Sequence, residues 1–324
     1  MLKQILSFPY QLVHTLRCAL NSKQEKLPRP VISIGNLSFG GTGKTPVTIA
    51  IAKYLAESGM KVCILTRGYK SKASSFPLIV SSKDKSLPSV EETGDEALEM
   101  LESFKQAGLD VTVAIDPKRF RAGLEALKNQ ELDVFILDDG MQHINLHRDI
   151  EIVLKNVNES GFYREFPWAE KKADYLIHTK VDEDWLGQHN DKHSAVFNLS
   201  LNKKLDYKKG IGVFTAIGDS ESLVKMIKDL IKKETNNSVI EPIKLMIFPD
   251  HHFFSLAEVT HALSLGINII TTSKDLVKIP VEHRGKFHTV SLDLGFLPES
   301  FLPELRTKVA SSLGGNKDDA GSSG

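Results

Sequence analysis

A glycine-rich bend between an apolar run and a helical pattern constrains the fold of this chain most. Residues 31–55 read VISIGNLSFGGTGKTPVTIAIAKYL. A buried strand, a Gly-Gly-x-Gly-Lys-Thr turn and a helix follow one another directly, and this context is typical of a phosphate-binding loop. Glycines let the backbone approach an anion closely, and the first amides of the helix point toward it. The stretch therefore predicts a nucleotide-binding loop at the carboxyl end of a buried strand.

Each residue type in this loop suits phosphate binding. The lysine would reach the terminal phosphates, and the threonine hydroxyl would coordinate Mg²⁺. The match to the general pattern is imperfect, because Ser38 replaces its first glycine and Phe39 stands where a related variant carries a second lysine. The predicted cofactor-binding residues of the loop are Gly40, Gly41, Thr42, Gly43, Lys44 and Thr45.

Continuously apolar runs alternate with helical patterns along most of the chain. The runs VISIG, KVCILT, VTVAI, DVFILDD, IEIVL and ADYLIHT read as buried strands. Helical periodicity separates the earlier runs, and the alternation predicts an α/β fold with a doubly wound, mostly parallel sheet of the P-loop NTPase type. After a polar stretch near 183–210 the pattern resumes, which predicts a second, smaller α/β domain.

The same patterns give domain boundaries. We expect an amphipathic segment over 1–30, a P-loop domain over 31–195 and a smaller α/β domain over 196–295. A C-terminal helix would follow over 296–313. The last residues, 314–324, are poor in apolar side chains and are expected to be disordered.

Composition narrows the partners and the compartment. Lys plus Arg and Asp plus Glu number 41 each, so no basic excess points to a nucleic-acid partner. Cys18 and Cys63 form no CxxC pair, which fits a reduced, cytoplasmic setting. No run reaches the ~18 apolar residues of a membrane-spanning helix. The amphipathic N-terminal segment could dock on its own protein or lie on a membrane surface; docking is the commoner arrangement.

Acidic residues follow the strand DVFILDD, where a P-loop partner is expected. Asp138 and Asp139 would hold Mg²⁺ directly or through water, and because neighbouring strand residues point to opposite sides, only one is expected to face the metal directly. A second acidic group lies in ETGDEALEM. Thr93 and Glu96 have the spacing of a capping box. Alternatively, Asp95 and Glu96 lie beside the loop, one as a base and one as a metal ligand, and both interpretations stay open on the residues alone.

Histidines and one short motif allow further interpretations. His143 and His147 lie four residues apart, but no Glu follows the first histidine, which argues against a zinc site.

The Asp-His-His triplet at 250–252 lies between aromatic residues and is either a polar cap or part of an active site. The sequence from Thr179 to Asp182 is similar to a guanine-reading motif, and that from Thr271 to Asp275 more weakly so; GTP remains a minority option.

Seven segments in the same order resemble the tetraacyldisaccharide 4'-kinase family, the lipid A 4'-kinases of Gram-negative bacteria. They run from residue 31 to about 280, and the amphipathic N-terminus is similar to the family's membrane-associated start. The segments are SIGNLSFGGTGKTP, LTRGYKSK, TGDEALEM, ILDDGMQHINLHRDIEIVL, KKADYLIHTK, FPDHHFFS and TTSKDLVKI.

The resemblance implies a reaction and a location. A two-domain α/β enzyme would lie peripherally on the cytoplasmic face of the inner membrane, whose surface would be a partner. It would transfer the γ-phosphate of ATP, with Mg²⁺, to the 4'-hydroxyl of a tetraacyldisaccharide 1-phosphate. We expect a monomer that binds no nucleic acid, with the lipid headgroup between the two domains.

Roles for individual residues follow from the same resemblance. Asp95 would accept the proton of the sugar hydroxyl, paired with a histidine of the triplet; His251 is favoured but not separated from His252. Thr45, Glu96, Asp138 and Asp139 would form the metal site, and Lys44 would hold phosphate. The implied nucleotide contacts are Arg67 and Tyr69, and the implied substrate contacts are Asp95, Arg119 and His143.

One departure and two alternatives remain. The segment NESGFYREFPWAEKKAD keeps Arg164 and Glu165 of a family pattern but lacks its Pro-x-Gly part, which leaves adenine contacts and acyl specificity open. A membrane-associated P-loop ATPase or GTPase switch without a lipid acceptor is the main alternative, although Phe39 and the Asp-His-His triplet argue against it. A kinase or synthetase for a soluble substrate is the other.

Overall fold

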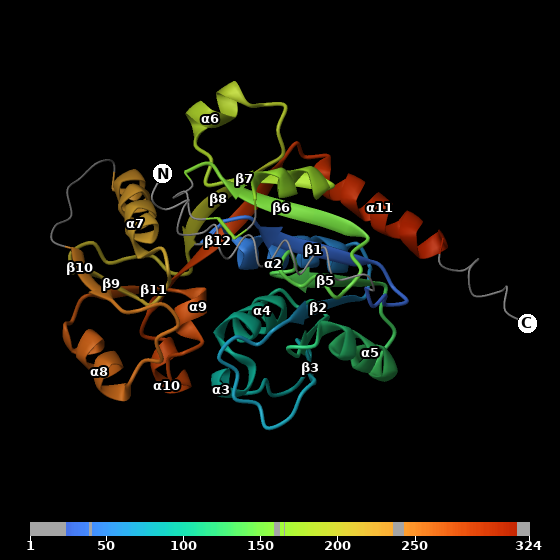
Figure 1. Ribbon diagram of the computed structural model, residues 1–324. Coiled ribbons are helices and arrows are strands. Elements are labelled where there is room, and N and C mark those ends of the chain that lie inside the picture. The colour runs from blue at the N-terminus through green and yellow to red at the C-terminus, as the bar shows by residue number, and fades with distance from the viewer. Residues whose placement is uncertain (1–23, 39–40, 159–162, 165, 236–242, 316–324) are drawn as a thin grey trace, which may run out of the picture. The chain divides into compact units, whose positions relative to one another are not determined.

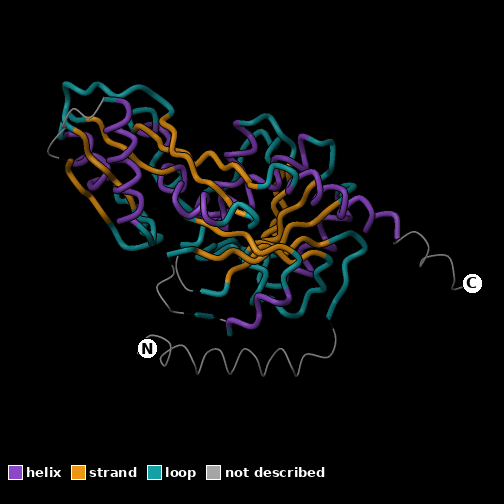
Figure 2. Tube along the Cα trace, turned by 90° about the horizontal axis from the view of Figure 1, so that it is seen from above, coloured by secondary structure: helices purple, strands orange, loops and turns teal. Residues whose placement is uncertain are grey.

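The structure is a computed structural model that describes residues 24–38, 41–158, 163–164, 166–235 and 243–315. The predicted segment 1–30 lies largely outside these residues, as does most of the predicted tail. Helices and strands alternate along the described chain (Figures 1 and 2). The α/β fold with a mostly parallel sheet is confirmed. The chain divides into two compact units, residues 1–196 with 294–324 and residues 197–293, which we call unit 1 and unit 2.

Unit 1 is built on strands in the order β8-β7-β6-β1-β5-β2-β4-β3. All neighbours pair in parallel except β3, which runs antiparallel to β4. The central strands are buried along their whole length, which explains their continuously apolar sequences. The bounds are β1 Val31–Asn36, β2 Val62–Thr66, β3 Leu78–Ser81, β4 Val111–Ile115, β5 Val134–Asp138, β6 Ile150–Asn156, β7 Tyr175–Thr179 and β8 Ser194–Leu201.

Helices cover both faces of this sheet. The crossovers β1–α2–β2 and β4–α5–β5 run in opposite directions across it, and right-handed crossovers therefore place α2 and α5 on opposite faces. Helix α4 contacts α2, and α11 contacts α2 as well. The helix bounds are α2 Lys44–Glu57, α3 Val90–Thr93, α4 Asp95–Gln106, α5 Arg119–Asn129, η1 Pro167–Lys172, α6 Glu183–Gln188 and α11 Phe301–Gly315.

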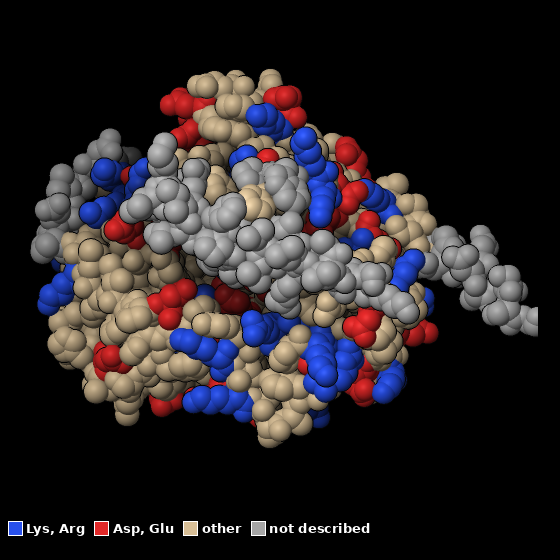
Figure 3. Space-filling view, viewed as in Figure 1, with Lys and Arg blue, Asp and Glu red and all other residues tan. Residues whose placement is uncertain are grey.

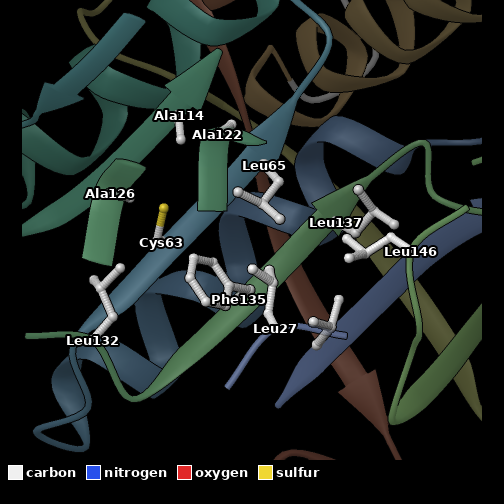
Figure 4. Packing of buried hydrophobic residues seen from close by; sticks show 11 residues of the cluster. Leu27, Cys63, Leu65, Ala114, Ala122, Ala126, Leu132, Phe135, Leu137 and Leu146 are labelled. Carbon is white, nitrogen blue, oxygen red and sulfur yellow. The ribbon is translucent and has the colours of Figure 1, made fainter. Parts of the chain in front are cut away.

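The packing beneath α5 shows how the chain before β1 joins the core. Ala122 and Ala126 of α5 lie over Cys63, Phe135 and other residues of β2, β4 and β5 (Figure 4). Leu27 is fully buried in the same cluster. Small residues on α5 leave room for this leucine, so the segment just before β1 is part of the folded unit.

Unit 2 contains parallel strands in the order β10-β9-β11-β12. Helix α7 packs on one apolar cluster and α8 on another, which is rich in aromatic residues, among them Phe214, Phe254 and Phe287. Strand β12 runs across the unit boundary. The bounds are β9 Ile211–Thr215, β10 Ile243–Ile247, β11 Asn268–Thr272, β12 His288–Leu297, α7 Ser220–Glu234, α8 Leu256–Ser264, α9 Ser273–Leu276 and α10 Val281–Arg284.

The structure corrects one of the interpretations left open for Thr93 and the description of residues 183–210 as a polar stretch. Thr93 does not cap α4: the capping box is formed one turn earlier, by Ser89 and Glu92 at the start of α3, and α4 begins after Gly94 with no side-chain cap. The φ of 82° at Gly94 separates the two helices, so the spacing from Thr93 to Glu96 crosses a break. The stretch 183–210 is not merely polar either, because α6 and β8 lie within it.

Two surface properties bear on partners. Both signs of charge appear on the face shown in Figure 3, as expected from equal totals of acidic and basic residues. Among the helices of the described residues, none has the length and apolar character needed to cross a membrane.

Candidate active site

The phosphate-binding loop joins β1 to α2. Gly43 caps the helix with a φ of 85°, and Lys44 and Thr45 form its first turn. Thr42 is buried and Gly41 is exposed, whereas Gly40 lies outside the described residues. The Lys44 ammonium donates to Asn36 Oδ1 at 3.1 Å, and the Asn36 amide in turn donates to the Ser38 carbonyl at 2.7 Å. The buried Asn36 therefore ties the lysine to the end of β1.

Asp138 ends β5 directly beside this loop, because its register partner on β1 is Ile34. Its side chain is buried and accepts a hydrogen bond from Thr48 Oγ1 at 3.2 Å. Burial raises the pKa of the Asp138 carboxyl to about 7, and the charges of Glu96 and Asp139 add to the rise, while Lys44 opposes it. The same interactions place Glu96, Asp139 and Lys44 within electrostatic reach of Asp138.

Asp139 occupies the turn after β5 with a φ of 50°, a left-handed conformation in which Asp is more tolerated than most residues. Its Oδ1 lies 3.5 Å from the Lys44 ammonium, and both carboxylate oxygens accept from Arg164 Nη1 at 3.3 Å. The P-loop lysine, the acid of the neighbouring strand and an arginine from a distant loop thus meet at one place.

The donors in this region suit Mg²⁺, which prefers oxygen ligands. Asp138, Asp139 and Glu96 offer carboxylates, and Thr45 offers a hydroxyl in the first turn of α2. Within the described residues no group of three or more His, Cys, Asp or Glu side chains forms a ready metal cage. Mg²⁺ in proteins is commonly held by one or two carboxylates together with substrate phosphates and water.

Asp95 is the first residue of α4 and is buried. Its Oδ1 accepts from the amide of Glu96 at 3.0 Å, in the first turn of α4. The loop that carries Tyr69 packs against this helix start: a Cβ on Gly94 would lie 2.6 Å from the Tyr69 carbonyl oxygen. The tyrosine side chain itself is half exposed.

A positive group lies next to the acidic one. Arg119, at the start of α5, is buried and donates to the Pro117 carbonyl at 3.0 Å. Burial lowers the pKa of its guanidinium, and the charge of the exposed Arg67 lowers it further. Burial, with Arg119 and Arg148 nearby, also lowers the pKa of His143 to about 4, so this imidazole is neutral at pH 7. Guanidiniums within electrostatic reach of one another are suited to binding an anion.

The Asp-His-His triplet lies in unit 2, after β10. His252 is engaged locally: its Nε2 lies 3.1 and 3.2 Å from the Glu258 oxygens, and its ring stacks on Phe248 at 5.0 Å. His251 has a φ of 59°, and its Nε2 lies 3.6 Å from Asp250 Oδ2. Because Asp95 belongs to unit 1, its pairing with either histidine stays a prediction.

The segments that are similar to guanine-reading motifs have local structural roles. Asp182 caps α6 by accepting from the Trp185 amide at 2.8 Å. Asp275 is fully buried and accepts from Thr215 Oγ1 at 2.6 Å and from the Ala216 amide at 3.1 Å. Both carboxylates are thus used by the fold of their own units.

Sequence reasoning did not assign several residues that border the site. Thr48 follows Lys44 by one helical turn, a spacing that could have identified it. Arg164 was noted only as part of a family pattern, and nothing in the local sequence indicates its contact with Asp139. Asn36 and Arg148 act through contacts two to eight residues away along the chain, but these contacts cross turns and do not follow helical or strand spacing.

A P-loop at the end of β1, an acid at the end of β5 and a mostly parallel sheet define a P-loop nucleotide-binding protein of the phosphotransferase class. The sequence model of the tetraacyldisaccharide-1-P 4'-kinase family matches residues 1–310, and the chain belongs to that family. It is an ATP-dependent kinase of lipid A biosynthesis, as the resemblance implied, and the nucleotide-switch alternative is not favoured.

Individual relatives agree. A tetraacyldisaccharide 4'-kinase from Aquifex aeolicus is 34% identical over 295 residues, covering 84% of this chain and 88% of the relative. One from Blochmanniella pennsylvanica is 44% identical over 265 residues, covering 77% and 73%. The crystal structure of an "apo" form LpxK from Aquifex aeolicus in complex with ATP superposes with a TM-score of 0.74 at 29% identity, covering 97% of this chain and 100% of that one.

Proposed function

We propose that this chain transfers the γ-phosphate of ATP to the 4'-hydroxyl of a tetraacyldisaccharide 1-phosphate. The observation that carries the proposal is the meeting of Lys44 with Asp139, beside the buried Asp138, at the carboxyl ends of two neighbouring parallel strands. Ligands of open α/β sheets bind outside the carboxyl ends of the strands, and phosphoryl transfer depends on positioning and charge neutralisation there.

Different residues of the loop are proposed to make different contacts with the nucleotide. Backbone amides of Gly41 to Thr45, at the start of α2, would bind phosphate, and Gly40 remains a predicted contact of the same kind. Lys44 neutralises charge on the terminal phosphates. Thr45, Glu96, Asp138 and Asp139 would hold Mg²⁺, which would supply further neutralisation of the charge on the phosphates.

Asp95 is the proposed general base. It accepts the proton of the 4'-hydroxyl while the sugar oxygen forms a bond to the γ-phosphorus, the bond to the β-phosphate oxygen breaks, and ADP leaves. His251 is the histidine we assign to support it, because His252 is already engaged by Glu258 and Phe248 within unit 2.

The basic group provides the proposed contacts to anionic parts of the two substrates. Burial and the charge of Arg67 lower the pKa of Arg119, and the neutral His143 lies within electrostatic reach of Arg119. A phosphate between these groups would relieve the repulsion of the two guanidiniums. We assign Arg119 and His143 to the lipid, and Arg67 and Tyr69 to the nucleotide.

Substitutions test these roles. Lys44→Ala and Asp139→Ala should lose most of the transfer activity, on the order of 10²–10³-fold in kcat, because each removes charge stabilisation from the transferred group. Asp95→Ala should lose a large but smaller share, at about the ~10² lower end of general-base effects. The measurement is the rate of lipid phosphorylation, and near-normal turnover by Lys44→Ala would refute the loop assignment.

We also propose that the protein acts as a monomer on the cytoplasmic surface of the inner membrane, through its N-terminal segment. The support is the amphipathic sequence of residues 1–23 and a lipid-linked substrate. A deletion must stop at residue 23, because the side-chain amide of Gln24 donates to the Ile144 carbonyl at 3.0 Å and Leu27 is buried in the core. The variant lacking residues 2–23 should lose binding to anionic vesicles in sedimentation. Unchanged vesicle binding by this variant would contradict the proposal.

A further inference from the structure

We propose that Arg148 and Glu151 are positioning residues that hold the Asp139 turn in the geometry needed for Mg²⁺ and nucleotide. The inference rests on the proposed metal role of Asp139. It assigns to this chain a clamp behind the metal site, built from residues that touch neither nucleotide nor lipid in the proposed function.

The clamp acts on the main-chain carbonyls of the two residues that follow Asp139. Arg148 Nη1 donates to the Gly140 carbonyl at 3.2 Å and to the Met141 carbonyl at 3.4 Å. From the other side, the Gly140 amide donates to the Ile34 carbonyl of β1 at 3.0 Å. The turn is therefore held at its amide by the strand that leads into the phosphate-binding loop. Its carbonyls are held by the Arg148 guanidinium, and the His143 amide also donates to the Gly140 carbonyl at 2.9 Å.

The turn needs such support because its backbone is unusual and its surroundings are tight. Asp139 has a φ of 50°, a conformation that persists for a non-glycine residue when the surrounding structure determines it. A Cβ on Gly140 would collide with Ser33 Oγ, and one on Gly35 would lie 2.5 Å from the Met141 Cβ. A small shift of this turn would move the Asp139 carboxylate away from Lys44.

Glu151 fixes the arginine. Its Oε2 lies 3.0 Å from Arg148 Nε, and its Oε1 accepts from Ser33 Oγ at 2.7 Å. The Glu151 side chain is 11% exposed and that of Arg148 is 18% exposed, so water competes little for this ion pair. The guanidinium thus bridges a carboxylate tied to β1 and the turn that carries Asp139, a planar fork that lysine cannot reproduce.

Arg148→Met tests the clamp while keeping most of the side-chain volume. Groups behind a metal ligand typically change metal affinity or activity by 10–100-fold, so we expect ~10-fold weaker Mn²⁺ binding and a comparable rise in the Mg²⁺ concentration for half-maximal rate. Mn²⁺ affinity is measured by electron paramagnetic resonance on the protein bound to a non-hydrolysable ATP analogue. Arg148→Lys, which keeps the charge, should recover part of both losses.

Arg29→Met is the matched control. Arg29 Nε also donates to a main-chain carbonyl, that of Leu132 at 2.7 Å, but at the amino ends of β1 and β5. It should leave Mn²⁺ affinity and Mg²⁺ dependence unchanged. Thermal unfolding of every variant separates loss of the clamp from loss of the fold, and Glu151→Gln provides a second, milder change at the same ion pair.

The outcomes are distinguishable. If Arg148→Met and Glu151→Gln are folded and bind Mn²⁺ like Arg29→Met, the inference is wrong. Asp139→Asn in the same binding measurement tests the proposed site itself: unchanged Mn²⁺ affinity there would remove the basis of both proposals, whereas its loss together with a normal Arg148→Met would overturn only the clamp.

Discussion

Two buried carboxylates in this protein, Asp138 and Asp275, have opposite kinds of neighbours. Asp138 is buried near Glu96 and Asp139. Burial raises the pKa of its carboxyl to about 7, and the two neighbouring negative charges add to this rise. Such an arrangement costs stability unless a cation or a proton is present, and it is typical of functional sites. Asp275 in unit 2 is instead buried beside the positively charged Lys278.

The Asp275–Lys278 pair gives a prediction at the scale of the residue. The two charged groups lie 2.7 Å apart and both side chains are fully buried. Lys278→Met would leave the Asp275 carboxylate buried without its cation, and breaking such a pair typically costs about 3–5 kcal/mol. The free energy of unfolding, from urea titration of the full chain, should fall by that amount.

Lys308→Met is the control for this prediction. It breaks the pair with Asp174, whose side chain is 33% exposed while that of Lys308 is 39% exposed, and an exposed pair contributes about 0–1 kcal/mol. Equal losses of stability in the two variants would show that burial does not determine how much the Asp275–Lys278 pair contributes to the free energy of unfolding.

At the scale of the element, the sequence predicted the parts of the fold whose signal is local. The buried parallel strands β1, β2, β4 and β5 are continuously apolar, and α2 follows a turn with its own motif. Strand β3 escaped prediction because it is four residues long, antiparallel and only partly buried. Strand β8 escaped because it is not continuously apolar like the central strands and most of its residues are only partly buried.

The candidate site divides in the same way. Lys44, Asp138 and Asp139 were predictable, because a motif marks the loop and the carboxyl ends of neighbouring parallel strands meet at one edge of a sheet. Arg148 and Arg164 were not assigned, since their contacts with the 139–141 turn join segments that no local pattern connects. Glu96 was placed by family resemblance, while its capping interpretation was wrong because Gly94 interrupts the helix.

At the scale of the whole molecule, the chain passes between its two units twice, at 196–197 and at 293–294, so both termini belong to unit 1. The proposed nucleotide, metal and anion contacts all come from unit 1, and unit 2 contributes the Asp-His-His triplet. Within unit 2 the main chain of this triplet is held by the His251 amide, which donates to the Ala216 carbonyl at 3.2 Å. The Ala216 amide in turn donates to the buried Asp275 carboxylate.

The most direct test of the central claim follows the γ-phosphate. Purified protein is incubated with γ-labelled ATP, Mg²⁺ and a tetraacylated disaccharide 1-phosphate in detergent micelles, with parallel reactions that contain GTP or lack lipid. We predict that label moves from ATP to the 4'-position of the lipid, with little release of free phosphate when lipid is absent. Release of phosphate without labelling of the lipid would contradict the account and favour a nucleotide-driven switch.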